Sequence, residues 1–410
     1  MRIRSTRVVT PSGVRAATLH IEEGLIAAID DARADVDYGE LVIMAGLVDS
    51  HVHVNEPGRT EWEGFDTATR AAAAGGITTI VDMPLNSIPP TTTLAALQTK
   101  RAAIDGKAHV NVELWGGVVP GNTSELRPML DAGARGFKCF LVDSGVEEFP
   151  NVNEAQLREA ARALAGTGAP LLVHAELGDH LHAPSGDPEE YATYLHSRPN
   201  AAEDAAIALL RDVQRETGAW IHIVHLSSAT ALPLLGDGLT AETTAHYLHF
   251  AAEDVPHGHT EYKCAPPIRE RANREALWRA LASGTLCCIV SDHSPCTPEL
   301  KRGDFMDAWG GIASLQFVLP IVWSGARARG FTIEDVARWC CEGTSNLARL
   351  PRKGRIETGA DADLVIWSPE ESFTITPDLI RHRHKVTPYL GATLYGVVKE
   401  TWVAGRAVPH

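Results

Sequence analysis

A unit of one helix, one glycine and one short apolar strand repeats along the middle of this chain of 410 residues. In its clearest copy, Asn153 and Gln156 have the spacing of a capping box, which predicts a helix that ends near Gly166. The strand that follows reads PLLVH over residues 170–174 and ends in a histidine. Helices that alternate with apolar strands predict a parallel sheet covered by helices.

Two later copies of the unit also end in a residue that can bind a metal ion. Asn200, with Glu203 three residues later, should cap a helix that precedes the strand WIHIVH at residues 220–225. Asn273 should cap another helix, which precedes the strand LCCIVSD at residues 286–292. Each strand places a histidine or an aspartate at its carboxyl end.

An earlier copy starts near Thr60. Thr60 and Glu63 have capping-box spacing, and Gly75-Gly76 should end the helix before a strand at residues 77–81. Candidate metal-binding residues occur from His51 to Asp292, and an open sheet would not bring residues so far apart in sequence to one point. A closed barrel does so, because the carboxyl ends of its strands meet at one face. We therefore predict an α/β fold with a TIM-type (β/α)8 barrel.

The two ends of the chain follow a different pattern. Residues 1–46 and 350–410 contain short strand-like segments with alternating polar and apolar residues, separated by turn residues. We predict that both termini together build one small β-sandwich-like domain. The barrel, residues 47–349, would then be inserted between them.

His51 and His53 form a His-x-His pair after an apolar strand at residues 41–48. In a strand, residues i and i+2 face the same side, so both imidazoles can bind one metal ion. Taken alone, the pair is also compatible with two unrelated surface histidines.

His174, His225 and Asp292 end apolar strands, where core packing favours valine or isoleucine. A polar side chain at such a place needs a partner. A single histidine there is more often a hydrogen-bonded core residue, and Asp292 alone is compatible with an N-cap of the segment at Ser294. Their equivalent positions in successive units favour metal ligands. His222, three residues before His225, should face the other side of its strand and is assigned no role.

Lys138, in the segment GFKCFL, is the unusual member of the set. An ammonium group at neutral pH cannot coordinate a cation. Reaction of the amine with CO2 would give a carbamate, whose oxygens can bridge two metal ions about 3.5–4 Å apart. Without the other ligands, Lys138 is an ordinary lysine at a strand end with its charge in solvent. Together, the six residues predict a two-metal hydrolase site with an N6-carboxylated Lys138.

The overall charge narrows the class of partner. With 37 basic and 52 acidic residues, the net charge is -15 and no long basic run occurs. Nucleic acid and membrane surfaces are therefore not expected partners, whereas a small neutral substrate is compatible.

The first residues lack the apolar stretch of a signal peptide, which predicts a cytoplasmic protein. The cysteines, including the adjacent pairs Cys287-Cys288 and Cys340-Cys341, lack disulfide spacing and should be reduced and mostly buried.

The combination of these motifs resembles the cyclic amidohydrolases of the amidohydrolase superfamily, and the resemblance covers nearly the whole chain. It implies two divalent metal ions, of which zinc is expected first and Mn, Co or Fe are also compatible with the donors. The implied roles are His51 and His53 for the first ion, Lys138 for the bridge, His174 and His225 for the second ion, and Asp292 to complete the site. The resemblance also implies a homo-oligomer, commonly a homotetramer.

Within this superfamily, residues 51–65, 83–89 and 136–140 resemble the allantoinase branch. The branch hydrolyses the hydantoin ring amide of allantoin, a cyclic ureide, to allantoate in purine and ureide degradation. Asn55 stands where dihydroorotases usually carry an arginine for a substrate carboxylate, and Asp143 stands where hydantoinases and dihydropyrimidinases typically carry a tyrosine. Thr244-Ala245 replaces the usual Cys-Pro, which bears on local backbone shape and substrate fit.

The resemblance also places Asn86, Ala265 and Gly311 near the substrate ring. Arg59 is a further candidate, for a ureido oxygen, although an arginine after Pro-Gly is equally compatible with a structural anchor of its loop. Asp292 is expected to act as general base and then as general acid. Two alternatives stay open: a hydantoinase or dihydropyrimidinase acting on another cyclic ureide, and a non-catalytic protein like the dihydropyrimidinase-related scaffolds.

Overall fold

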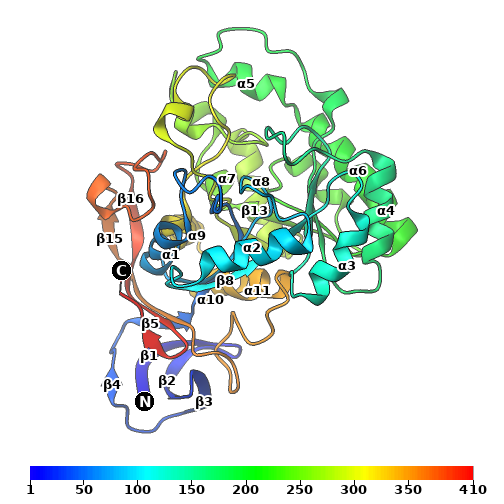
Figure 1. Cartoon of the computed structure of the whole chain (residues 1–410). Helices are drawn as coiled ribbons and strands as arrows, with labels where there is room; N and C mark the ends of the chain where they lie inside the picture. Colours follow the sequence, from blue (N-terminus) through cyan, green and yellow to red (C-terminus); the bar gives the residue numbers. More distant parts are fainter. Residues whose placement is uncertain (410) are drawn as a thin grey trace.

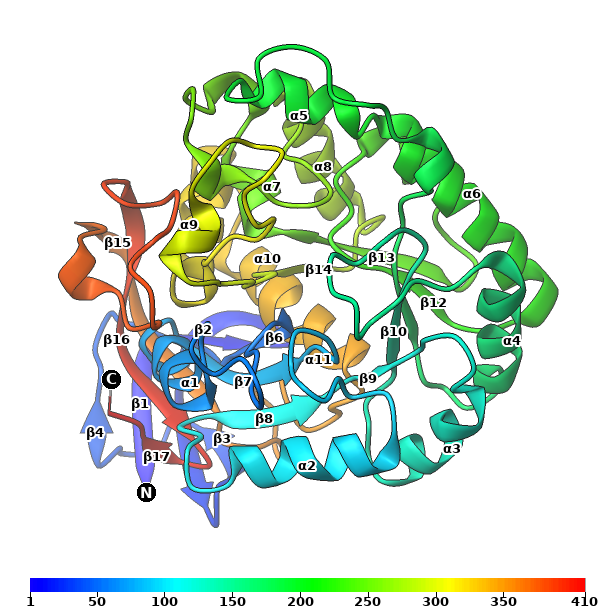
Figure 2. The same ribbon diagram turned by 45° about the horizontal axis from the view of Figure 1, so that its top comes forward.

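A barrel of parallel strands forms the centre of the computed structural model, which describes residues 1–409 (Figures 1 and 2). The predicted (β/α)8 barrel is thereby confirmed. Its strands, with β8 and β9 together forming the third, are β6 (Leu47–Val52), β7 (Ile77–Asp82), β8 (Asn111–Leu114), β9 (Gly116–Gly117), β10 (Phe137–Phe140), β11 (Leu171–His174), β12 (Ile221–Ile223), β13 (Leu239–Thr244) and β14 (Cys288–Val290).

The barrel closes between its first and last strands. Val52 and His293 form a parallel bridge, and the His53 N–H donates to the His293 carbonyl at 2.8 Å. Trp115 separates β8 from β9, and its indole donates to the Ser50 carbonyl inside the barrel at 2.8 Å. Buried apolar side chains such as that of Val81 fill the rest of the interior. A filled interior places the chemistry at the rim of the barrel, not in a channel.

Helices surround the strands, and Figure 2 shows α2, α3, α4 and α6 following one another around one side. This arrangement follows from the sequence where helices such as α1 and α4 carry a buried apolar face. The helices are α1 (Phe65–Ala74), α2 (Leu94–Ile104), α3 (Thr123–Asp131), α4 (Glu154–Leu164), α5 (Tyr191–Ser197), α6 (Asn200–Thr217), α7 (Ala245–His249), α8 (Arg271–Ser283), α9 (Val318–Ala328), α10 (Ile333–Ala337) and α11 (Gly343–Leu347).

Both ends of the chain contribute to one further sheet of eight strands, seen beside the barrel in Figure 1. The order is β17-β16-β15-β5-β1-β2-β3, and β4 pairs with β1. This confirms that both termini share one β structure, here a continuous sheet. Its strands are β1 (Arg2–Thr10), β2 (Gly13–Glu22), β3 (Leu25–Asp30), β4 (Val36–Asp37), β5 (Val42–Ala45), β15 (Leu364–Thr374), β16 (Thr393–Val403) and β17 (Arg406–Ala407).

Local sequence signals account for two helix ends. The Asn153 side chain accepts from the Gln156 N–H, and the Gln156 side chain accepts from the Asn153 N–H, both at 3.0 Å. Helix α1 ends at Ala74 and is followed by Gly75, as predicted. These signals are readable because donor and acceptor lie within one turn of each other.

The predicted caps at Asn200 and Asn273 are wrong. Helix α6 begins at Asn200 itself, with Pro199 in the cap position. Helix α8 begins at Arg271, so that Asn273 lies in its first turn. The Asn273 side chain instead accepts from the Ala229 N–H at 2.8 Å, 44 residues away in sequence. A short polar side chain can satisfy a distant loop as well as its own helix, and the fold decides which.

The capping box predicted from Thr60 and Glu63 is also wrong. Helix α1 begins at Phe65, with Gly64 in the cap position. The buried Glu63 carboxylate accepts from the Arg383 N–H at 3.1 Å and therefore holds a C-terminal loop against the barrel.

The cysteines are free thiols, and all except the half-buried Cys287 are buried, as expected from their spacing. Within residues 1–409, no helix combines the length and the apolar character needed to cross a membrane.

Candidate metal centre

The structure gathers the six predicted ligands at the carboxyl end of the barrel. They come from five strands. They meet because the parallel strands of a barrel all end at the same rim. His51 and His174 lie at or near the ends of β6 and β11, His53 and His225 follow β6 and β12, Lys138 lies within β10, and Asp292 follows β14.

His51, His53 and Asp292 form one group that can hold a metal ion, with their ligand atoms all within 4.8 Å of one another. The Asp292 Oδ1 lies 3.2 Å from His51 Nε2 and 3.7 Å from His53 Nε2. Lys138 Nζ lies 3.1 Å from the same His51 nitrogen. Four side chains from three strands, β6, β10 and β14, thus face one point.

His174 and His225 form a second pair of facing nitrogens. His174 Nδ1 lies 3.1 Å from His225 Nε2, a separation that two nitrogens bound to one metal ion at about 2.0–2.1 Å can also have. The Phe140 ring stacks on His174 with 4.7 Å between the ring centroids. The pair lies next to the first group, because the rings of His51 and His225 are 5.3 Å apart.

Burial holds these imidazoles in the form that binds metal. It lowers the pKa of His51, His53 and His225 well below the ordinary value, and the positive charge of Lys138 contributes in each case. The pKa of His174 is lowered as well, mainly by burial. A neutral imidazole has the free lone pair that a cation needs, so the cluster fits divalent metal ions.

The environment of Lys138 differs from that of the other fully buried lysine, Lys100. Lys100 Nζ forms an ion pair with Asp82 at 2.6 Å. Lys138 has no carboxylate oxygen within 4.0 Å in the described part of the chain, and burial lowers its pKa to about 8. Such a lysine exposes a substantial fraction of the neutral amine, which is the form that reacts with CO2.

Two carboxylates that the sequence analysis did not select orient these histidines. Glu242 accepts from His51 Nδ1 at 2.6 Å, which leaves His51 Nε2 to face the ligand cluster. Glu176 lies 2.7 Å from His174 Nε2, and Arg198 holds Glu176 at 2.6 Å. A carboxylate behind a histidine is the usual arrangement at metal sites. The spacing of Glu176, two residues after His174, was a readable signal, whereas Glu242 is 191 residues from His51.

Three residues of the site have left-handed backbone. The φ angles of Asn86, His225 and Asp292 are 66°, 41° and 45°. Residues other than glycine adopt this region at an energetic cost, and such outliers gather at functional sites. The backbone turns that aim His225 and Asp292 at the cluster are therefore strained.

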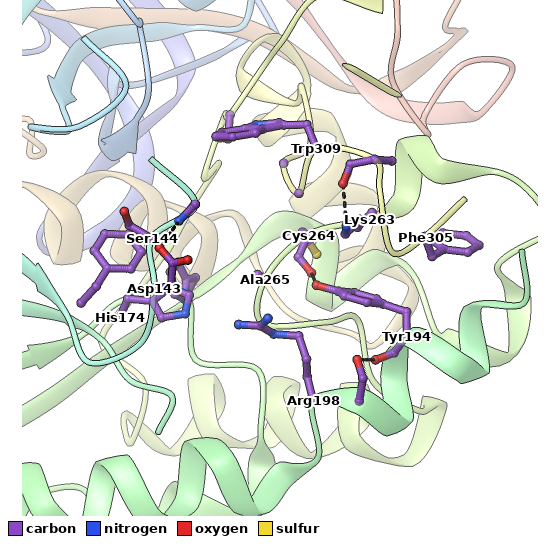
Figure 3. A pocket seen from close by; sticks show the side chains of 18 of the residues that line it. Asp143, Ser144, His174, Tyr194, Arg198, Lys263, Cys264, Ala265, Phe305 and Trp309 are labelled. Atoms are coloured by element: carbon purple, nitrogen blue, oxygen red, sulfur yellow. Dashed lines mark hydrogen bonds between the residues drawn. The ribbon is translucent and has the colours of Figure 1, made fainter. Parts of the chain in front are cut away.

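A cavity of about 500 Å³ opens over the cluster, and His53, Lys138, His174, His225 and Asp292 line part of it. Figure 3 shows His174 on one side of this cavity, Tyr194 and Lys263 on the other, and Arg198 reaching in from below. The Tyr194 hydroxyl donates to the Cys264 carbonyl at 2.8 Å, and Lys263 Nζ donates to the Met306 carbonyl at 3.0 Å. These bonds fix the wall of the cavity.

Three of the four predicted substrate-contact residues line this cavity: Asn86, Ala265 and Gly311. The Gly311 N–H, however, already donates to the Lys263 carbonyl at 2.9 Å. Arg59 is not among the residues that line the cavity. Its guanidinium pairs with Glu148 and donates to the Asn86 carbonyl at 3.1 Å, which is the alternative of a loop anchor.

The fold and the donor set are those of a barrel hydrolase that uses divalent metal ions. The amidohydrolase family model matches residues 42–408, and the chain belongs to this family. It is 51% identical to the allantoinase of Streptomyces avermitilis over 99% of this chain and 94% of that protein. It is 46% identical to the allantoinase of Arabidopsis thaliana over 99% of this chain and 87% of that protein.

A solved structure has nearly the same fold. The L-hydantoinase (dihydropyrimidinase) from Arthrobacter aurescens superposes with a TM-score of 0.92 at 30% identity, over 100% of this chain and 96% of that one. The barrel and the terminal sheet are therefore shared with this hydantoinase.

Proposed function

We propose that this chain is an allantoinase, which hydrolyses the hydantoin ring amide of allantoin to give allantoate. The observation that carries the proposal is the meeting of four neutral histidines, a buried lysine and an aspartate beneath one cavity. The similarity to allantoinases over nearly the whole chain selects the substrate among cyclic amides.

The proposed site holds two divalent ions, with zinc as the first expectation. His51 and His53 would bind one ion and His174 and His225 the other, with Asp292 completing the site. A carboxylated Lys138 would supply oxygen ligands to both. Bound divalent ions lower the pKa of a coordinated water and polarise a carbonyl oxygen.

The chain's own residues would orient the substrate and move the proton. Asp292 Oδ1 faces His51 and His53 and lines the cavity, so it can accept a proton from the attacking water and deliver it to the departing ring nitrogen. Burial raises the pKa of Asp292 to about 8 in the metal-free chain.

Two residues that line the cavity carry polar groups that complement a ureide. Among the described residues, Asn86 Oδ1 and Trp309 Nε1 are buried and have no hydrogen-bond partner. The first is an acceptor and the second a donor, whereas a ureide offers both N–H and C=O groups. We propose that Asn86 accepts from a substrate N–H and that Trp309 donates to a ureido oxygen.

Carboxylation of Lys138 has a direct test. Protein prepared with 13C-labelled bicarbonate should give one carbamate carbon signal, and the Lys138→Arg variant should lack it. Lys107→Arg, at a partly exposed lysine, is the control and should keep the signal. No carbamate signal from metal-loaded protein would exclude the modification.

A second candidate is a hydantoinase or dihydropyrimidinase that acts on another cyclic ureide, because the fold matches such an enzyme. Steady-state hydrolysis of allantoin, hydantoin, dihydrouracil and dihydroorotate by metal-loaded protein separates the two. Preference for allantoin supports the proposal. Bound metal without allantoin turnover would keep the site and assign another cyclic amide as the substrate. Neither bound metal nor turnover would favour the scaffold alternative.

Four further expectations stand as proposals beside this function. These are the division into a barrel at residues 47–349 and a domain from both termini, a homotetramer, a place in purine and ureide degradation, and a cytoplasmic location. Sedimentation of the purified chain tests the tetramer.

A further inference from the structure

A second cluster of metal-binding side chains lies near the opposite, amino-terminal end of the barrel strands. One ring nitrogen of His222 and the sulfurs of Cys287 and Cys288 all lie within 4.8 Å of one another. His222 lies on β12 and Cys288 begins β14, with β13 hydrogen-bonded between them. The cluster thus combines three side chains from neighbouring elements, and the proposed hydrolytic reaction uses none of them.

The hydrogen bonds of His222 fix which of its nitrogens can accept a cation. The Thr240 hydroxyl accepts from the Trp220 indole N–H at 3.0 Å and lies 2.8 Å from His222 Nδ1, to which it can donate its own proton. His222 Nε2 then carries the hydrogen and faces Glu242 at 3.4 Å. In the neutral imidazole, the lone pair of His222 Nδ1 meets the Thr240 hydroxyl, and a cation that binds this nitrogen would displace that hydrogen bond.

The two sulfurs are close together and one of them is reachable. Cys287 Sγ lies 3.4 Å from Cys288 Sγ. Cys287 is half-buried and lines a hollow of about 270 Å³ together with Trp220 and Thr240. An ion from solvent can therefore reach Cys287 without passing through the hydrolytic cavity. The hydrogen bond from Cys288 lowers the pKa of Cys287, which favours the thiolate form.

We propose that His222, Cys287 and Cys288 form a separate binding site for one thiophilic cation of the Zn²⁺ or Cd²⁺ type. Two sulfurs and one imidazole nitrogen are soft to borderline donors, which select such ions over Mg²⁺ and Ca²⁺. Three protein ligands leave a fourth position open toward the hollow. Binding releases the thiol protons, so the cluster changes from two thiols to two metal thiolates.

Glu242 joins this lower site to the hydrolytic site. Its Oε1 accepts from His51 Nδ1 and its Oε2 faces His222 Nε2, so one carboxylate orients a histidine on each side. The carboxylate–histidine–metal arrangement that supports His51 is therefore repeated for His222.

Titration of the metal-loaded enzyme with Cd²⁺ tests the proposal, because cadmium bound to thiolates absorbs in the ultraviolet by charge transfer. We expect one further equivalent of metal per chain, counted by elemental analysis, with a charge-transfer band that saturates at that equivalent. Cys287→Ser should abolish both. Cys341→Ser is the matched control from the other adjacent pair. Its hydroxyl can keep the bond from Cys341 to the Ala45 carbonyl, and the variant should retain both.

Three outcomes would overturn the inference: no charge-transfer band in the wild-type enzyme, an undiminished band in Cys287→Ser, or a band lost equally in Cys341→Ser. Circular dichroism of each variant shows whether it is folded. The Thr240→Val variant adds an independent measurement, because it frees His222 Nδ1 from its hydroxyl partner. Its Cd²⁺ affinity should equal or exceed that of the wild type, and a loss of binding would contradict the assignment of this nitrogen.

Discussion

Replacing Glu242 by glutamine tests whether the carboxylate behind His51 controls metal affinity. The bond from His51 Nδ1 to Glu242 is 2.6 Å long and both side chains are fully buried. A buried hydrogen bond to a charged group contributes about 1.5–3 kcal/mol, and a neutral one about 0.5–1.5 kcal/mol. Glu242→Gln keeps the acceptor oxygen and removes the charge, so the loss should be about 1–1.5 kcal/mol. This corresponds to roughly tenfold weaker metal binding.

The assay is competition for zinc between the apo-protein and a chromophoric chelator. Glu242→Ala removes the acceptor completely and should weaken binding by up to about 100-fold. Glu203→Gln is the matched control, because Glu203 is also buried but pairs with Arg269 at 2.7 Å. It should lower stability and leave zinc affinity unchanged. Equal affinities of Glu242→Gln and wild type would refute the reasoning, as would an equal loss in Glu203→Gln.

Three other substitutions give separate predictions. Asp292→Asn should abolish allantoin hydrolysis while much of the metal stays bound, as measured by turnover and elemental analysis; retained turnover would remove Asp292 from proton transfer. Arg198→Met leaves Glu176 as an unpaired buried charge and should cost about 3 kcal/mol in urea denaturation, and adding Glu176→Gln should restore most of it. If the double variant is no more stable than Arg198→Met, the ion pair is not the cause. Gly311→Ala would place its Cβ 2.3 Å from the Ser294 carbonyl oxygen and should lower the thermal midpoint, whereas at Gly310 the nearest atom is 3.9 Å away and alanine should be tolerated.

Several features were readable from the sequence because their causes are local. Asn153 and Gln156 satisfy each other within one helical turn, and Gly75 follows the last residue of α1. The apolar strands that end in histidine or aspartate also predicted the barrel correctly, since side chains at the ends of parallel strands must meet at one rim.

Signals with two possible partners were not readable. Asn273 looks like a helix cap, yet it binds the loop at Ala229, and Glu63 binds the distant backbone of Arg383. Propensity at a single residue cannot choose between a partner in its own helix and one that the fold brings close. The same limit applies to Arg59, whose loop-anchor contacts with Glu148 and Asn86 appear only in three dimensions.

The sequence alone determined four helix–strand units, the residue types at the strand ends and therefore the kind of chemistry. Only the tertiary structure decided which buried partners orient those residues. Glu242 lies 191 residues from His51 in sequence, and it orients His51 on one side and faces His222 on the other. The physical reason is that residue type and spacing fix local geometry, whereas the orientation and protonation of a buried side chain depend on neighbours that barrel closure brings together.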